Sequence, residues 1–231
     1  PTLGSWKAAD VHRRDVLGLL DGIVARGAPV QANRVLAILR KTYNWAISRE
    51  LVEHSPCAQV GRPTVEHERE RFLSEDEIRR FLLGLSNPDL EHVSQTTRHA
   101  LRFQLATGCR PGEAAGATWQ EFDLQAAVWT LPAARSKTGH AHTLPLSAFA
   151  LQILDDAHKL YPFSVVAFPR HDGTTPLSAW TVGSELRGAL AKREIAHFTA
   201  HDLRRSCATH LASLGHSRVV ISRVLGHALP G

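Results

Sequence analysis

Three residue types are scarce in this chain of 231 residues, which has no methionine, two tyrosines and three cysteines. Cys57, Cys109 and Cys207 are far apart and form no Cys-x-x-Cys pair, which favours a reduced, cytosolic compartment. No apolar run approaches the roughly 18 residues of a membrane span, and no charged-then-apolar signal segment opens the chain, so we expect no membrane partner. Because the chain begins with Pro1 and lacks methionine, we expect it to be a fragment of a longer polypeptide.

The positive charge of the chain is unevenly distributed. Hydrophobic residues make up 43 % of the sequence, enough for a real core, and the net charge is +5. Residues 1–62 hold nine Lys and Arg against five Asp and Glu, whereas residues 63–231 hold eighteen against seventeen. This excess in the N-terminal part suggests a polyanionic partner, although ordinary solvated faces also produce an excess of this size.

Two amphipathic helices are predicted in the first 60 residues. One extends from about Lys7 to Arg26 and ends at Gly27. The other follows Pro29 and has an apolar stripe at helical spacing, formed by Val35, Ile38, Leu39, Thr42, Tyr43 and Ala46.

Another face of the second helix carries Arg34, Lys41 and Asn44. This face is either the solvated side of a helical bundle or a surface laid against a DNA groove. In the second case the two cations would contact phosphates and Asn44 could reach base edges.

The remaining sequence predicts a linker and then a second, mainly helical part. The stretch Gly61–Arg71 is polar and contains proline, as linkers do. Ser74 and Glu77 form a capping box at the start of a helix, and a further helix is expected over Ser94–Ala106, stopped by Gly108. Two strands are predicted, Val128–Leu131 and Thr143–Leu146, followed by helices after Ser147. The expected fold class is therefore mainly α with a small antiparallel β-sheet.

A helix near the C-terminus combines a histidine and two arginines. Thr199 and Asp202 predict a capped start near Ala200, and Gly215 an end. Its buried stripe is expected to be Leu203, Cys207, Leu211 and Leu214.

His201 and Arg204 lie off that stripe, about 60° apart, and Arg204 borders the apolar face while Arg205 points away from it. A half-buried guanidinium is rigid, which suits bidentate binding of a phosphate. The alternative is a surface helix with an ordinary histidine and arginine.

Three more residues could join such a phosphate site. Arg110 precedes Pro111 at a helix N-terminus, where a cation opposes the helix dipole, so an anionic ligand or Glu113 should compensate it. Lys137 lies in a polar turn between the strands. His227 follows Gly226 at a helix C-terminus, where the dipole favours a cationic imidazole. Taken singly, each could be an ordinary surface residue.

Together these motifs resemble those of the tyrosine recombinases, the phage integrase family. The segment Thr107–Ala114 around Arg110, the Ser136–Gly139 turn around Lys137, the His201-x-x-Arg204 pair and the Leu225–His227 triplet occur in that family's order and broad spacing.

The resemblance extends over nearly the whole chain. Asn33–Leu36 and Tyr43–Ile47 resemble the family's core-binding domain. His142–Ser147 and Phe198–Arg205 are most similar to prophage and genomic-island integrases.

The resemblance implies a core-binding domain over residues 1–62, a linker over 63–71 and a catalytic domain over 72–231, truncated at its C-terminus. It implies double-stranded DNA with an attachment-type site as the partner, self-association into a tetrameric synapse, and a cytoplasmic, nucleoid-associated location in a prokaryote or phage. No cofactor and no metal are implied.

The family's reaction breaks a DNA phosphodiester by tyrosine attack and leaves a 3′-phosphotyrosyl link, which a 5′-hydroxyl later reverses. By resemblance, Arg110 and Arg204 hold the phosphate, His227 adds a donor, and His201 donates or carries a proton. Lys137 protonates the departing 5′-oxygen, and Glu113 orients Arg110 or His201. Cations placed at the five-coordinate phosphorus stabilise the transition state more than the ground state.

The chain departs from the family pattern at its end. The family's tyrosine follows the last histidine, and here only Ala228–Gly231 follow His227. Tyr43 and Tyr161 do not fit the position and are expected to be packing residues. We therefore expect this chain to bind DNA without forming the covalent link in cis.

Other classes of function remain open from the sequence. Residues 206–226 resemble a helix-turn-helix, which would suit a non-catalytic DNA-binding regulator. That alternative predicts an outward-facing segment, whereas a recombinase predicts convergence of Arg110, His201, Arg204 and His227. The type IB topoisomerases share the recombinase chemistry. A metal enzyme is disfavoured, because the fourteen histidines include no His-Glu-x-x-His pattern.

Overall fold

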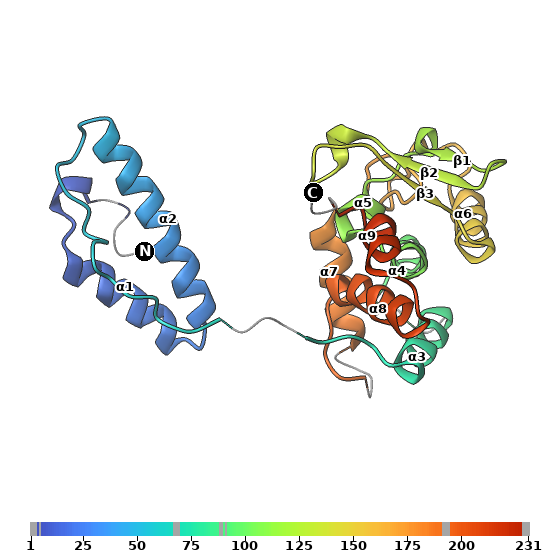
Figure 1. The fold of residues 1–231 in the computed structure, drawn as a ribbon, viewed down its shortest axis with the longest axis horizontal. Coiled ribbons are helices and arrows are strands. Elements are labelled where there is room, and N and C mark those ends of the chain that lie inside the picture. The colour runs from blue at the N-terminus through green and yellow to red at the C-terminus, as the bar shows by residue number, and fades with distance from the viewer. Residues whose placement is uncertain are drawn as a thin grey trace. The chain divides into compact units, whose positions relative to one another are not determined.

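The computed structural model describes residues 4, 6–66, 70–87, 90, 92–190 and 195–227. The chain divides into two compact units, Pro1–Arg69 (unit 1) and Glu70–Gly231 (unit 2). The helices of both units and the sheet of unit 2 are drawn in Figure 1. Among the described residues, no helix combines the length and apolar character that a bilayer crossing requires.

Unit 1 is an antiparallel helical pair. α1 spans Arg13–Ala25, α2 spans Pro29–Ser48, and a 3₁₀ turn, Ala8–Asp10, precedes them. Its core is formed by Val16, Leu20, Ile23, Ala32, Leu36, Tyr43, Cys57 and Val60. The segment after α2 therefore returns to cover the groove between the two helices.

Two details of unit 1 differ from the prediction. The first helix starts at Arg13 instead of near Lys7, because His12 and Asp15 form a capping box there. The stripe predicted on α2 is wrong in part, since Ile38 is 64 % exposed and Thr42 is also exposed. The buried face is centred on Leu36 because both α1 and the returning segment pack against that side.

Unit 2 is mainly helical with a small sheet, as predicted. Its elements are α3 Glu75–Ser86, α4 Gln95–Thr107, α5 Pro111–Ala115, η2 Trp119–Glu121, β1 Phe122–Asp123, β2 Val128–Leu131, η3 Ala133–Arg135, β3 His142–Pro145, α6 Ala148–Leu160, α7 Ala179–Leu190, α8 Ala200–Ser213 and α9 Arg218–Leu225. The strands form an antiparallel sheet in the order β1-β2-β3, with Trp129 opposite Leu144 and Leu131 opposite His142.

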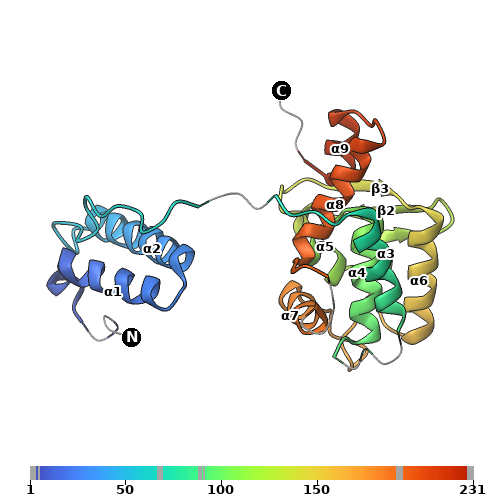
Figure 2. The same cartoon turned by 90° about the horizontal axis from the view of Figure 1, so that it is seen from below.

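Helix α4 is the centre of unit 2. It contacts α5, α6, α7 and α8, and Figure 2 shows it between α6 on one side and α8 on the other. Because it is covered on several sides, even Thr97, Arg98 and Gln104 are buried. The helix that ends just before Arg110 is thus also the one against which α8, carrying Arg204, is packed.

The local predictions for unit 2 are mostly confirmed. The Ser74–Glu77 and Thr199–Asp202 capping boxes are both present. The third strand begins at His142, one residue earlier than predicted, and the two-residue β1 was missed. The expectation of helix throughout after Ser147 is wrong between α6 and α7, where the chain forms isolated bridges, Thr118 with Val166 and Pro169 with Pro176.

Candidate active site

Arg110 is held by Glu113 at the start of α5. Gly108 ends α4 in the left-handed conformation (φ 66°), and Pro111 is the first residue of α5. The Glu113 carboxylate accepts from the Arg110 backbone N–H at 2.8 Å and from Arg110 Nη1 at 2.7 Å. Glu113 is buried and the Arg110 side chain is 19 % exposed, so the arginine is the member of this pair that reaches the surface.

Arg204 is more deeply buried than the sequence indicated. Its residue is 5 % exposed. Nη1 donates to the Gly108 carbonyl oxygen at 2.8 Å, while Nη2 donates to the Leu225 carbonyl oxygen at 2.5 Å and to His227 Nε2 at 2.9 Å. The Arg204 guanidinium therefore joins the end of α4, the end of α9 and His227.

Gly108 makes this arrangement possible. A Cβ at that position would lie 2.9 Å from Cys207 Sγ and 3.1 Å from Leu225 Cδ2. The close approach of α8 and α9 to this turn brings the Gly108 carbonyl within reach of Arg204.

His227 accepts a hydrogen bond and is therefore neutral in this state. A guanidinium can only donate, so Nε2 must be the unprotonated nitrogen and Nδ1 carries the hydrogen. Burial lowers the pKa of His227, and the charges of Arg204 and Arg110 lower it further. The expectation that the helix dipole would favour a cationic imidazole is wrong, because these two effects oppose it.

His201 lies on the exposed side of the first turn of α8. Loss of hydration lowers its pKa first, and the charges of Arg204, Arg205 and Arg110 add to that effect. The pKa of Arg204 is also lowered, by burial and then by Arg110. Arg110, His201, Arg204 and His227, called here the cationic cluster, are thus close enough for their charges to interact. The recombinase interpretation predicts that these four residues converge, and the hydrogen bond between Arg204 and His227 is the direct contact within the set.

Lys137 is exposed in the turn between β2 and β3. Ser136 Oγ lies 2.9 Å from Thr138 Oγ1 and accepts from the Thr138 N–H, and Gly139 adopts a positive φ of 72°. Within the part of the chain that the structure describes, the Lys137 ammonium makes no hydrogen bond or ion pair. The structure does not bring it into contact with the cationic cluster.

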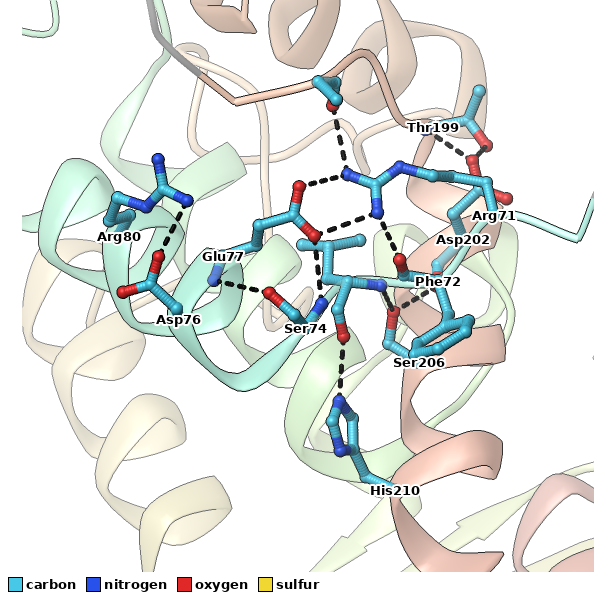
Figure 3. Close-up of polar contacts among 12 residues, drawn as sticks. Arg71, Phe72, Ser74, Asp76, Glu77, Arg80, Thr199, Asp202, Ser206 and His210 are labelled. Atoms are coloured by element: carbon cyan, nitrogen blue, oxygen red, sulfur yellow. Dashed lines mark hydrogen bonds and ion pairs between the residues drawn. The ribbon is translucent and has the colours of Figure 1, made fainter. Parts of the chain in front are cut away.

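Contacts that the sequence did not reveal fix α8 in place (Figure 3). Ser206 Oγ accepts from the Leu73 N–H at 2.8 Å, and His210 Nε2 donates to the Leu73 carbonyl oxygen at 2.8 Å. Arg71 donates to the Glu77 carboxylate through two nitrogens at 2.9 and 2.6 Å. The segment that leads into α3 is thereby bonded to the helix that carries His201 and Arg204.

The buried face of α8 also differs from the prediction. Leu214 is 74 % exposed, and Cys207 and Leu211 are only partly buried, whereas Arg204 and Ser206 face the interior. The helix is rotated because its polar side finds partners in other segments. Arg205 pairs with Asp202 at 3.3 Å and does not point fully away.

Neither tyrosine of the chain reaches the cationic cluster by a described contact. The hydroxyl of Tyr43 donates to the Ala8 carbonyl oxygen in the core of unit 1. Tyr161 follows α6 and lies against Gly173. Both are packing residues, as expected. Cys109 is no substitute nucleophile, since burial raises its pKa to about 12.

Arg34, Lys41 and Asn44 lie in unit 1, on the exposed side of α2. Ile38 and Trp45 are exposed on the same helix, and Arg49 lies 6.0 Å from the centre of the Trp45 ring. The helix thus presents a mixed cationic and apolar surface.

In unit 2, α9 is exposed over most of its length, as the regulator alternative predicted, with only Leu225 buried. That alternative leaves the cationic cluster unexplained. In the described ranges, no group of three or more His, Cys, Asp or Glu side chains is arranged to hold a metal ion.

Comparison with known proteins identifies the family. Residues 71–230 match the Phage integrase family, and residues 1–62 match the Phage integrase central domain. The chain therefore belongs to the phage integrase family, as its motifs indicated.

Individual relatives are similar over nearly the whole chain. Prophage integrase IntA of Escherichia coli (strain K12) is 27 % identical over 230 residues, which cover 98 % of this chain and 54 % of IntA. Tyrosine recombinase XerD of Shewanella oneidensis is 28 % identical over 229 residues, covering 95 % of this chain and 74 % of XerD. The chain spans about half the length of IntA and of a second prophage integrase, IntZ (52 %).

The fold resembles that of solved integrases. A lambda integrase(75-356) dimer bound to a COC′ core site has a TM-score of 0.76 at 20 % identity, with 99 % of this chain and 83 % of that chain covered. A lambda integrase tetramer bound to a Holliday junction has a TM-score of 0.73 at 21 % identity, with 96 % and 65 % covered. These similarities confirm the mainly α fold class with its small sheet.

Proposed function

We propose that this chain is part of a site-specific DNA recombinase that cuts and rejoins DNA through a 3′-phosphotyrosyl intermediate. The observation that carries the proposal is the buried guanidinium of Arg204, which donates to His227 and to the carbonyl oxygen of Gly108, two residues before Arg110. Family membership and the similarity to DNA-bound integrases support the choice of DNA as substrate.

In this proposal Arg110 and Arg204 bind the non-bridging oxygens of the scissile phosphate. Arg204 is already fixed by two carbonyl groups, and Arg110 by Glu113, so little reorganisation is needed when the phosphorus becomes five-coordinate. His227 donates to the same oxygens, and His201 donates or carries a proton near the nucleophile. The Lys137 side chain reaches the departing 5′-oxygen and protonates it.

The assembly around this chemistry is also part of the proposal. We assign residues 1–62 to a core-binding domain, 63–71 to a linker and 72–231 to a catalytic domain. Arg34 and Lys41 bind phosphates, and Asn44 reaches base edges. The partner is a double-stranded, attachment-type DNA site on which the protein forms a tetramer, in a cytoplasmic, nucleoid-associated setting.

The proposal is tested with a suicide DNA substrate that traps the covalent link. In protein expressed from the complete open reading frame, Arg204→Ala should reduce trapping by at least about 100-fold, the usual cost of removing one transition-state donor. Arg80→Ala is a matched control, because it breaks an exposed pair with Asp76 on α3. Undiminished trapping by Arg204→Ala would refute the proposal.

A second measurement uses the 231-residue polypeptide alone. Since the Tyr43 hydroxyl is bonded within unit 1 and Tyr161 packs against Gly173, this polypeptide should bind duplex DNA without forming a covalent adduct. Adduct formation by it would show that one of these tyrosines attacks, which the proposal does not allow.

A further inference from the structure

Arg135 connects the Lys137 turn to the segment that carries Arg110. It is the last residue of η3 and lies two residues before Lys137. Its Nη2 donates to the Glu113 backbone carbonyl oxygen at 2.8 Å, and its Nε lies 2.7 Å from Glu121 Oε1. The guanidinium therefore joins α5 and η2 to the base of the turn.

Glu121 is a rigid anchor for this contact. Its side chain is 6 % exposed and also accepts from the indole Nε1 of Trp129 at 2.9 Å. Trp129 is itself fully buried in β2. A planar guanidinium bonded to a carboxylate with so little freedom is restricted in both position and orientation.

The end of α5 is shaped to admit the Arg135 side chain. A Cβ at Gly116 would overlap Arg135 Nη1 and lie 3.6 Å from its Cζ. The backbone of Gly116 has φ −98°, which any residue can adopt. The absence of a side chain at Gly116 thus makes room for the guanidinium. The backbone conformation at this position does not itself require a glycine.

Glu113 is the residue shared by both arginines. Its side chain holds Arg110, and its backbone carbonyl oxygen accepts from Arg135. Glu113 consequently sets the spacing between the Arg110 segment and Arg135, which forms the base of the Lys137 turn. The Lys137 side chain, two residues beyond Arg135, is exposed.

We propose that Arg135 is a positioning residue that fixes the base of the Lys137 turn against Glu113, so that Lys137 reaches the oxygen leaving a phosphate bound at Arg110. This inference rests on the function proposed above. In the step concerned, the tyrosine hydroxyl gives its proton to His201 and its oxygen forms a bond to phosphorus. The bond from phosphorus to the 5′-oxygen breaks, and the Lys137 ammonium proton passes to that oxygen. Displacements of about 1 Å at such a contact can cost about 100-fold in rate.

The test compares an ordinary suicide substrate with one in which the leaving 5′-oxygen is replaced by sulfur. A thiolate is a far better leaving group than an alkoxide and needs no general acid. In protein from the complete open reading frame, Arg135→Ala should slow single-turnover cleavage of the oxygen substrate by about 10- to 100-fold. On the sulfur substrate, the cleavage rate of Arg135→Ala should stay within about threefold of the rate of the unmodified protein. A threefold change in rate corresponds to less than about 1 kcal/mol of activation free energy.

A second variant keeps the arginine. Gly116→Ala should displace the Arg135 guanidinium from its contact with Glu113, because the added Cβ would meet Nη1 first. It should show the same selective loss on the oxygen substrate, so the test does not depend on Arg135→Ala being folded. Arg80→Ala should change neither rate.

Lys137→Ala distinguishes failure of this inference from failure of the proposed function. If sulfur does not restore cleavage by Lys137→Ala, Lys137 is not the general acid and both ideas fall. If sulfur restores Lys137→Ala but both Arg135→Ala and Gly116→Ala are slowed equally on the two substrates, or not slowed at all, only the role of Arg135 is refuted.

Discussion

The ion pair between Arg71 and Glu77 should account for much of the acid sensitivity of unit 2. Glu77 accepts from two nitrogens of Arg71 and from the Ser74 N–H at 3.0 Å, and Arg71 also donates to the carbonyl oxygens of Phe72 and Ala196 (Figure 3). These contacts, with the bonds from Arg71 contributing most, lower the pKa of Glu77 from 4.5 to about 2. We predict that Glu77→Gln removes this pH dependence.

The size of the effect follows from the pKa shift. A difference of about 2.5 units corresponds to at most about 3.4 kcal/mol, at 1.36 kcal/mol per unit. The two side chains are 23 % and 16 % exposed, so solvent screening reduces this to about 1–2 kcal/mol. Because the folded pKa lies below the unfolded one, this stability is present above about pH 4.5 and is lost as the pH falls through about 2.

The assay is urea unfolding at pH 7, 5 and 3, followed by the fluorescence of the unit 2 tryptophans, Trp119, Trp129 and Trp180, in a Trp6→Phe, Trp45→Phe background that silences unit 1. Glu77→Gln should lower the free energy of unfolding by about 1–2 kcal/mol at pH 7, and the difference should fall below about half of that by pH 3.

The control is Asp76→Asn, which breaks the exposed pair with Arg80 and should cost less than about 0.5 kcal/mol at every pH. A difference between Glu77→Gln and the unmodified protein that is the same at all three pH values would refute the electrostatic reasoning.

Three further predictions concern other parts of the chain. Gly108→Ala should lose about 2–4 kcal/mol in urea unfolding, since it adds a steric clash to a strained φ, whereas Gly139→Ala has the strain without the clash and should lose about 1 kcal/mol. Lys41→Ala should weaken binding to all DNA duplexes alike and reduce the salt dependence of the affinity by about one phosphate contact. Asn44→Ala should mainly reduce discrimination between DNA sites. Both effects are measured by the fluorescence anisotropy of labelled duplexes. Burial lowers the pKa of His99, so as the pH falls the imidazole is protonated in the unfolded chain before it is in the folded one. The free energy of unfolding should therefore fall as the pH drops below about 6.5. His99→Gln should flatten that part of the pH profile.

Local signals in the sequence predicted the starts of helices well. Ser74 with Glu77 and Thr199 with Asp202 each place a capping side chain three residues from its partner, and both boxes are present. Capping depends on a few neighbouring residues only, so it can be inferred without knowing the fold. The Arg110–Glu113 pair belongs to the same class, since both members lie in one turn.

Burial was predicted less well, because it depends on distant segments. Arg204 is buried since its acceptors are the carbonyl groups of Gly108 and Leu225, 96 and 21 residues away in sequence. Ser206 is buried through its contact with Leu73, at a separation of 133 residues. Helical periodicity assigns polar residues to the solvent side, and it has no means of registering partners that other elements supply.

The same distance explains why Arg135 was missed. In the sequence it is one cation in a polar turn, and its acceptors on Glu113 and Glu121 are identified only once β2 and α5 are packed together. Gly116 gave no signal either, because a glycine after a short helix is expected to end it, and only the structure shows that its φ of −98° is one any residue adopts.

The cationic cluster is electrostatically unfavourable as it stands, and that property bears on function. Burial and mutual repulsion lower the pKa of His201, Arg204 and His227 together. A bound phosphate would supply the missing negative charge and reverse the repulsion, which favours the protonated imidazoles. His227 could then donate from both ring nitrogens, whereas in the free site its Nε2 accepts from Arg204. The carbonyl contacts hold Arg204 in place without that charge, so the proposed phosphate site would need little rearrangement of this guanidinium when an anion binds.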